Sequence, residues 1–239
     1  MASHLRRSFE KELIGLMSMS YIALIVVTMI IGCGATWYVN SQIKKYTKVN
    51  ASTGITGAQM AQRMLAANGV TGVQIYQGGP SEDHFDPRSN SITLDPDAYS
   101  GTSITAIATA CHEVGHACQY AQGYTPMKIR SALVPAVNFA SNAWVFILMI
   151  GIILNLSGLA LLACLVYAVV VAFQLVTLPV EFNASRRGLA YLSTQGLSQS
   201  EESGAFSVLR ACALTYVAAA LTSVLQLLYY LSIARGNDN

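Results

Sequence analysis

Three long apolar stretches constrain the fold of this chain more than any other feature. They cover residues 13–39, 132–178 and 205–233, and Arg210 is the one charged side chain within them. Each stretch exceeds the roughly 20 apolar residues that a helix needs to cross a bilayer. Hydrophobic residues make up 53% of the chain and charged residues 11%, a composition typical of membrane proteins.

The second stretch is too long for one crossing. As a single helix, its 47 residues would extend over about 70 Å, more than twice the thickness of a hydrocarbon core. It is interrupted at Asn155–Gly158, so we expect two antiparallel spans, 132–154 and 159–178. The first stretch exceeds the apolar region of a signal peptide, which favours a retained span over a cleaved leader.

The segment between the first two spans has the pattern of a small mixed domain. Short helices are expected over 58–67 and 104–121, the second beginning after the capping residue Ser103. Alternating apolar residues predict strands over 70–77 and 91–94, with the second strand at an edge that could pair with an extended substrate. The polar cluster Glu82–Arg88 is interpreted as a loop.

The helix over 104–121 carries the motif H-E-x-x-H at His112, Glu113 and His116. Residues four apart share a helix face, so both imidazoles can bind one metal ion. The intervening glutamate can then contact a water at an open coordination position, which is the arrangement of a catalytic zinc site. The alternative is a helix with two histidines packed in a core.

Topology suggests the third ligand. If 132–178 is a hairpin, the chain returns to the side of the membrane that holds both histidines, and Glu181 emerges there at the membrane surface. A carboxylate beside two imidazoles is a known zinc ligand set. A carboxylate at a helix start is the other interpretation of Glu181. Other possible ligands on that side are His84, Asp83, Asp86, Asp95, Asp97, Glu201 and Glu202.

The cysteines Cys111 and Cys118 flank the two histidines and allow a four-ligand structural zinc site as an alternative. Four ligands on two turns of one helix cannot surround an ion tetrahedrally, so we interpret both as packing residues in a reducing compartment.

Charge asymmetry indicates the orientation. Seven basic residues lie near the span ends on the side of the histidines and four on the other side, which favours a cytoplasmic catalytic side. The net charge of +2 and the absence of a basic, aromatic-interleaved run exclude a nucleic-acid partner.

Several blocks, the metal motif among them, resemble one family, the YugP-type neutral zinc metallopeptidases of the membrane. The blocks are Lys45-Tyr46, Thr56–Ala58, Asp83–Arg88, His112–Ala117, Arg130–Pro135, Leu178–Arg187 and Ala213–Ala218, in the family's order. The resemblance covers roughly residues 43–235 and implies a bacterial multi-pass membrane protein with zinc protease activity.

The chain is also similar, more distantly, to the HtpX and CAAX prenyl protease group. There a downstream glutamate completes the zinc site, and the likeness places it at Glu181. That group commonly has an aspartate four residues later, where this chain has Ser185. A role for that position in steadying a ligand histidine is therefore in question.

These observations predict a function. His112, His116 and Glu181 are expected to hold one Zn²⁺ per chain, and Glu113 to act as general base in peptide-bond hydrolysis. His84 is the favoured oxyanion-stabilising residue, ahead of Tyr124 and Arg186. The expected substrate is a membrane or membrane-proximal protein; protein partners or homo-oligomers are left open. The alternatives are a zinc-bearing scaffold without turnover and, more remotely, a transporter.

The expected fold is mainly α: a multi-pass α-helical membrane protein of about four spans with a small α+β, zincin-like metallopeptidase domain, located in the cell membrane. The expected segments are a tail (1–12), span 1 (13–39), the zincin-like domain (40–131), the hairpin of spans 2 and 3 (132–178), a third-ligand helix with a polar loop (179–204), span 4 (205–233) and a tail (234–239).

Overall fold

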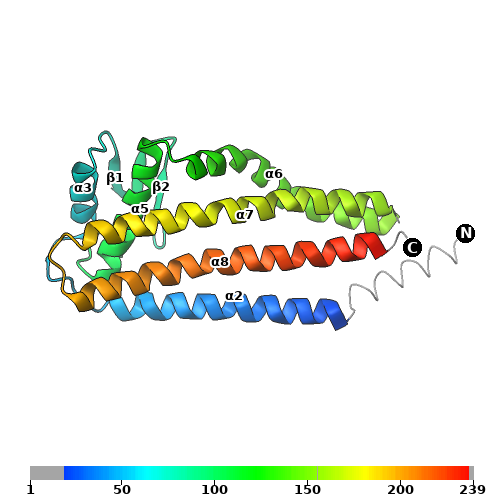
Figure 1. Cartoon of the computed structure of the whole chain (residues 1–239), viewed down its shortest axis with the longest axis horizontal. Coiled ribbons are helices and arrows are strands. Elements are labelled where there is room, and N and C mark those ends of the chain that lie inside the picture. Colours follow the sequence, from blue (N-terminus) through cyan, green and yellow to red (C-terminus); the bar gives the residue numbers. More distant parts are fainter. Residues whose placement is uncertain (1–18, 155, 237–239) are drawn as a thin grey trace, which may run out of the picture. The chain divides into compact units, whose positions relative to one another are not determined.

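The computed structural model describes residues 19–154 and 156–236 (Figure 1). The chain falls into two compact units that are described separately. One comprises residues 35–129 and 177–216, and the other comprises the described parts of 1–34, 130–176 and 217–239. The expected tail 1–12 and the start of the first apolar stretch lie outside the described residues.

Four long helices carry the apolar stretches. Each has an 18-residue window apolar enough to cross a membrane, with mean hydropathy between 1.8 and 2.7. They are α2 (Met19–Tyr46), α6 (Thr125–Leu154), α7 (Ser157–Leu192) and α8 (Gln199–Gly236). The expectation of a mainly helical chain with about four membrane-length helices and a small α+β part is therefore confirmed.

The break between α6 and α7 lies where the sequence predicts it. The two helices nonetheless differ from the expected spans at their outer ends, since α6 begins seven residues before 132 at Thr125. In addition, α7 continues through Pro179 to Leu192, so residues 179–192 belong to the same helix as the apolar stretch before them. The polar loop is correspondingly short, because α8 already begins at Gln199.

Aromatic side chains pack together within the unit that contains most of the apolar helices. The rings of Trp144 and Tyr167 have centroids 4.6 Å apart, and Tyr230 lies 5.5 Å from Trp144. The hydroxyl of Tyr167 donates a hydrogen bond of 2.6 Å to Gln226. These contacts join α6, α7 and α8 inside the apolar unit.

The other unit contains the short elements. Helix α3 (Gly57–Ala67) begins at a capping box formed by Thr56 and Gln59, and α4 (Pro96–Ser100) follows the N-cap Asp95. The Ser103 hydroxyl accepts a hydrogen bond from the Ala106 amide, so it caps α5 (Ile104–Ala121) as predicted.

Three strands form a small sheet in the order β1-β3-β2. Strand β1 (Gln74–Gln77) pairs parallel with β3 (Ser91–Leu94), and β2 (His84–Asp86) pairs antiparallel with β3. The expectation that 91–94 forms an edge strand is wrong, because that strand has a neighbour on both sides. The polar cluster contains β2 and is not a loop throughout.

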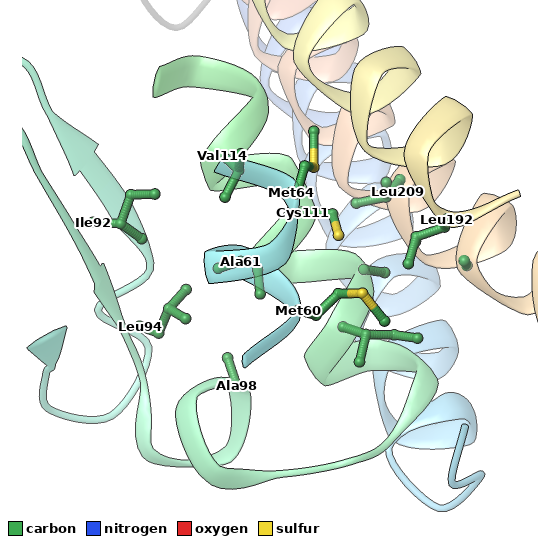
Figure 2. Packing of buried hydrophobic residues seen from close by; sticks show 14 of the residues in the cluster. Met60, Ala61, Met64, Ile92, Leu94, Ala98, Cys111, Val114, Leu192 and Leu209 are labelled. Atoms are coloured by element: carbon green, nitrogen blue, oxygen red, sulfur yellow. The ribbon is translucent and has the colours of Figure 1, made fainter. Parts of the chain in front are cut away.

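The core of this unit lies between the sheet and the helices. Figure 2 shows Met60 and Met64 of α3 between the strand residues Ile92 and Leu94 and the helix residues Leu192 and Leu209. These side chains are almost fully buried. Burial of apolar surface on this scale fixes α5 against the sheet and against α7. Helices α5 and α7 are the two that carry the candidate ligands.

Candidate metal centre

Helix α5 presents the H-E-x-x-H motif inside the folded unit. Its buried residues include Cys111, Val114, Ala117 and Cys118, which anchor one side of the helix in the apolar core. His116 is only 7% exposed, and His112 is partly exposed. A helix pinned in this way holds both imidazoles on one fixed face.

Two glycines allow α5 and α7 to approach closely. A Cβ atom on Gly115 would lie 2.6 Å from the carbonyl oxygen of Ala184, and a Cβ on Gly188 would lie 3.2 Å from that of Cys111. The first distance is shorter than real Cβ atoms adopt, and the second is tighter than most of their contacts, so Gly115 permits the helix crossing and Gly188 eases it. Gly115 therefore lies where α5 and α7 approach each other closely.

This crossing brings Glu181 against both histidines. Its Oε2 atom lies 3.2 Å from Nε2 of His112 and 3.4 Å from Nε2 of His116, and the two Nε2 atoms are 3.2 Å apart. Candidate ligand atoms of all three residues lie within 4.8 Å of one another. Glu181 is 2% exposed, so its carboxylate is shielded from solvent within this cluster.

The second nitrogen of each imidazole also has a partner. Nδ1 of His112 lies 3.1 Å from the Ser185 hydroxyl, one turn after Glu181 on α7. Nδ1 of His116 lies 3.1 Å from the side-chain oxygen of Gln119 on α5. Hydrogen bonds at Nδ1 orient the rings and leave Nε2 free, as in metal-binding histidines generally. The Ser185 hydroxyl therefore lies within hydrogen-bonding distance of the His112 imidazole.

Glu113 lies on α5 between the two histidines in sequence and is 7% exposed.

The pKa of His116 is subject to opposing effects. Burial by itself would lower this pKa, but the hydrogen bond of His116 with Glu181 and the charges of Glu113 and Glu181 hold it above the ordinary value. The carboxylates of Glu113 and Glu181 thus both act electrostatically on the imidazole of His116.

The two cysteines beside the motif do not join this cluster. Cys111 and Cys118 are fully buried free thiols in the apolar core. Burial raises the pKa of both thiols, which opposes the thiolate form that a zinc ligand requires. The four-ligand alternative therefore has no support in the described structure.

The structure places His84 differently from the three candidate ligands. It is exposed on β2 and pairs with Thr93, on the strand face opposite the buried Phe85. Phe85 packs against Tyr120 of α5, with ring centroids 5.8 Å apart. No hydrogen bond or ion pair joins His84 to the ligand cluster among the described residues, and its oxyanion role stays a prediction.

The other oxyanion candidates have different surroundings. Tyr124 directs its hydroxyl to the Pro179 carbonyl oxygen at 3.5 Å, and Arg186 is exposed. Asp83 sits just before β2 and accepts a hydrogen bond of 2.9 Å from the Asp95 amide. Burial raises the pKa of Asp83 to about 6, with smaller contributions from the charges of Asp95 and Glu113.

Comparison with known proteins places this cluster in context. Residues 21–235 match the model of a family described as "Putative neutral zinc metallopeptidase". The chain belongs to this family. It is also 41% identical over 217 residues to a Bacillus subtilis (strain 168) protein described as "Putative membrane protease YugP", an alignment that covers 90% of this chain and 96% of that protein. No solved structure matches the chain.

Membership in this zinc metallopeptidase family confirms the resemblance that the sequence blocks indicated. The matched region contains His112, Glu113, His116 and Glu181. The family match specifies no residues, so their roles in catalysis and metal binding stay predictions.

Sequence reasoning missed Gln119, which is fully buried and hydrogen-bonded to His116. The available signal was its spacing, because a residue three positions after a histidine lies on the same helix face. The sequence contains no indication of the contacts of Gln119 with α7, because these contacts depend on how α5 and α7 cross.

Proposed function

We propose that this protein is a membrane-embedded zinc metalloprotease that hydrolyses peptide bonds of membrane or membrane-proximal proteins. The observation that carries the proposal is the convergence of His112, His116 and Glu181 from two helices far apart in sequence. Family membership supports zinc peptidase chemistry in general.

The residues present fit a zinc ion. Two neutral imidazoles and one carboxylate form a ligand set of the kind found in catalytic zinc sites, which keep a fourth position open for water. Both Nδ1 atoms have hydrogen-bond partners, so both Nε2 atoms are available as ligands. When bound, zinc acidifies a water molecule and polarises the carbonyl of the scissile bond.

Glu113 supplies the proton transfers in this proposal. Its carboxylate accepts the proton of the attacking water and then delivers that proton to the nitrogen of the leaving amine. Metal binding alone does not need a carboxylate at this position, so Glu113 favours a catalytic over a purely scaffolding role. His84 remains the proposed oxyanion-stabilising residue.

The substrate class follows from where Glu181 lies along the chain. It is three residues beyond the apolar stretch that ends at Leu178, within the same continuous helix α7. At 1.5 Å per residue, this separation is about 5 Å along the helix axis. We therefore propose a site close to the lipid surface, in a multi-pass protein of the cell membrane with its catalytic side in the cytoplasm.

The test compares wild-type protein with Glu113→Gln, both full-length and purified in detergent with zinc. Hydrolysis of a quenched-fluorescent peptide library and of unfolded membrane proteins would be measured beside zinc content. The variant should keep its zinc and lose about 10²–10⁴-fold in rate, the usual contribution of a general acid–base group. Cleavage at the wild-type rate would exclude this role for Glu113. A wild-type protein that holds zinc and cleaves none of these substrates would favour a scaffold.

A further inference from the structure

Gln119 connects the two helices that supply the candidate ligands. Its side chain is 0% exposed. Its Oε1 atom lies 3.1 Å from Nδ1 of His116, and its Nε2 atom donates to the Val180 carbonyl oxygen at 2.7 Å and to Oδ1 of Asn183 at 3.0 Å. All polar atoms of this buried amide therefore have partners on α5 or α7.

The Val180 carbonyl fixes the direction of these hydrogen bonds. A carbonyl oxygen can only accept, so the amide nitrogen of Gln119 must face α7 and the amide oxygen must face His116. The amide oxygen in turn can only accept, which places the proton of the neutral imidazole on Nδ1 of His116. The unprotonated Nε2 then faces His112 and Glu181.

The contacts with α7 lie on either side of a candidate ligand. Val180 precedes Glu181 and Asn183 follows it by two residues. One side chain therefore holds the imidazole of His116 and the backbone segment that carries the Glu181 carboxylate.

A second polar contact extends this connection outward. The Arg187 guanidinium donates to Oδ1 of Asn183 at 2.8 Å and to the side-chain oxygen of Gln122 at 2.7 Å. Arg187 thus bridges the same two helices without touching His116 or Glu181. It offers a control for the general effect of losing an α5–α7 contact.

We propose that Gln119 is a positioning residue that sets the zinc affinity of the site, by holding His116 in its Nδ1–H tautomer and fixing the Glu181 segment beside it. Gln119 acts through His116 and through the α7 segment that carries Glu181. The inference rests on the proposed zinc site, but the tautomer of His116 can be measured without any metal.

The experiment uses full-length protein in detergent and the variants Gln119→Leu and Arg187→Met. Zinc dissociation constants would be measured by competition with a chromophoric chelator. Gln119→Leu should weaken zinc binding by about 10- to 100-fold, the usual effect of removing the partner of a ligand histidine. Arg187→Met should bind zinc close to the wild-type level. Wild-type affinity in Gln119→Leu would overturn the proposal.

Nitrogen-15 NMR of histidine-labelled, metal-free protein at pH 8.5 gives the second readout. His116, assigned with the variant His116→Ala, should show the Nδ1–H tautomer in wild type and a mixture in Gln119→Leu. If Gln119→Leu does not fold, Gln119→Glu decides, because its carboxylate still accepts from Nδ1 and should preserve the tautomer. A mixture of His116 tautomers in Gln119→Glu or in wild type would overturn the proposal. A wild-type protein that does not bind zinc would count against the proposed function alone.

Discussion

Gly115 of α5 lies directly against Ala184 of α7, at a distance that leaves no room for a side chain. A Cβ atom at position 115 would be 2.6 Å from the Ala184 carbonyl oxygen and 2.9 Å from its Cα atom. Because both contacts are backbone atoms, a larger residue would have to move one helix. The position of Glu181 relative to the two histidines therefore depends on a glycine inside the motif.

Gly115→Ala should consequently separate α5 from α7. We expect a loss of about 1–3 kcal/mol in the free energy of unfolding, the usual cost of overpacking, together with weaker zinc binding. Thermal unfolding in detergent and chelator competition would measure both. Gly34→Ala is the matched control, since a Cβ at this helical glycine meets nothing within 4 Å. Equal unfolding temperatures and equal zinc affinities in Gly115→Ala and Gly34→Ala would contradict the close crossing of α5 and α7.

Ser185 should contribute to zinc affinity through His112. Its hydroxyl lies 3.1 Å from Nδ1 of His112, so Ser185→Ala leaves this ring without its partner. We expect zinc binding to weaken by about tenfold, at the lower end of the effect of such partners. Ser185→Asp offers a carboxylate to the same nitrogen and should bind zinc at least as tightly as wild type. Unchanged affinity in Ser185→Ala would exclude this role.

Asp83 should make stability depend on pH. Burial raises its pKa from an ordinary 3.8 to about 6, opposed by the hydrogen bond from the Asp95 amide and aided by the smaller effects of the charges of Asp95 and Glu113. The folded protein therefore binds this proton more tightly than the unfolded chain. The resulting stabilisation is complete below pH 3.8 and is lost as the pH rises through about 6.

Asp83→Asn removes this dependence while keeping an oxygen that can accept from the Asp95 amide. Between pH 4 and pH 6.5, the unfolding temperature of wild type should fall relative to that of Asp83→Asn. Asp86→Asn is the control, because hydrogen bonds from Arg88 lower the pKa of Asp86. A constant difference between wild type and Asp83→Asn across this range would show that Asp83 is not protonated preferentially in the folded state.

The sequence predicted the helices of this fold better than its sheet. Long apolar stretches and caps such as Ser103 act locally, so the break near Asn155 and the beginning of α5 follow from neighbouring residues. Which strands lie side by side in a sheet depends on pairing between residues that are far apart in the sequence. The polar segment around His84 gave no sign that it would pair with Ile92 and its neighbours and place β3 at the centre.

The candidate site shows the same division. His112, Glu113 and His116 were recognisable from spacing on one helix, and Glu181 from the topology of the apolar stretches. The contacts of Gln119 with Val180 and Asn183 could not be predicted, because they require the crossing of α5 and α7 in three dimensions.

The most direct test of the proposed metal centre is the zinc content of the full-length protein purified in detergent, compared with Glu181→Ala and His116→Ala. We expect about one zinc ion per wild-type chain and loss of that zinc in both variants. Glu202→Ala, which alters a carboxylate on α8 outside the cluster, should keep it. Zinc lost only in His116→Ala would contradict Glu181 as the third ligand, and no zinc in any sample after reconstitution would contradict the metal centre itself.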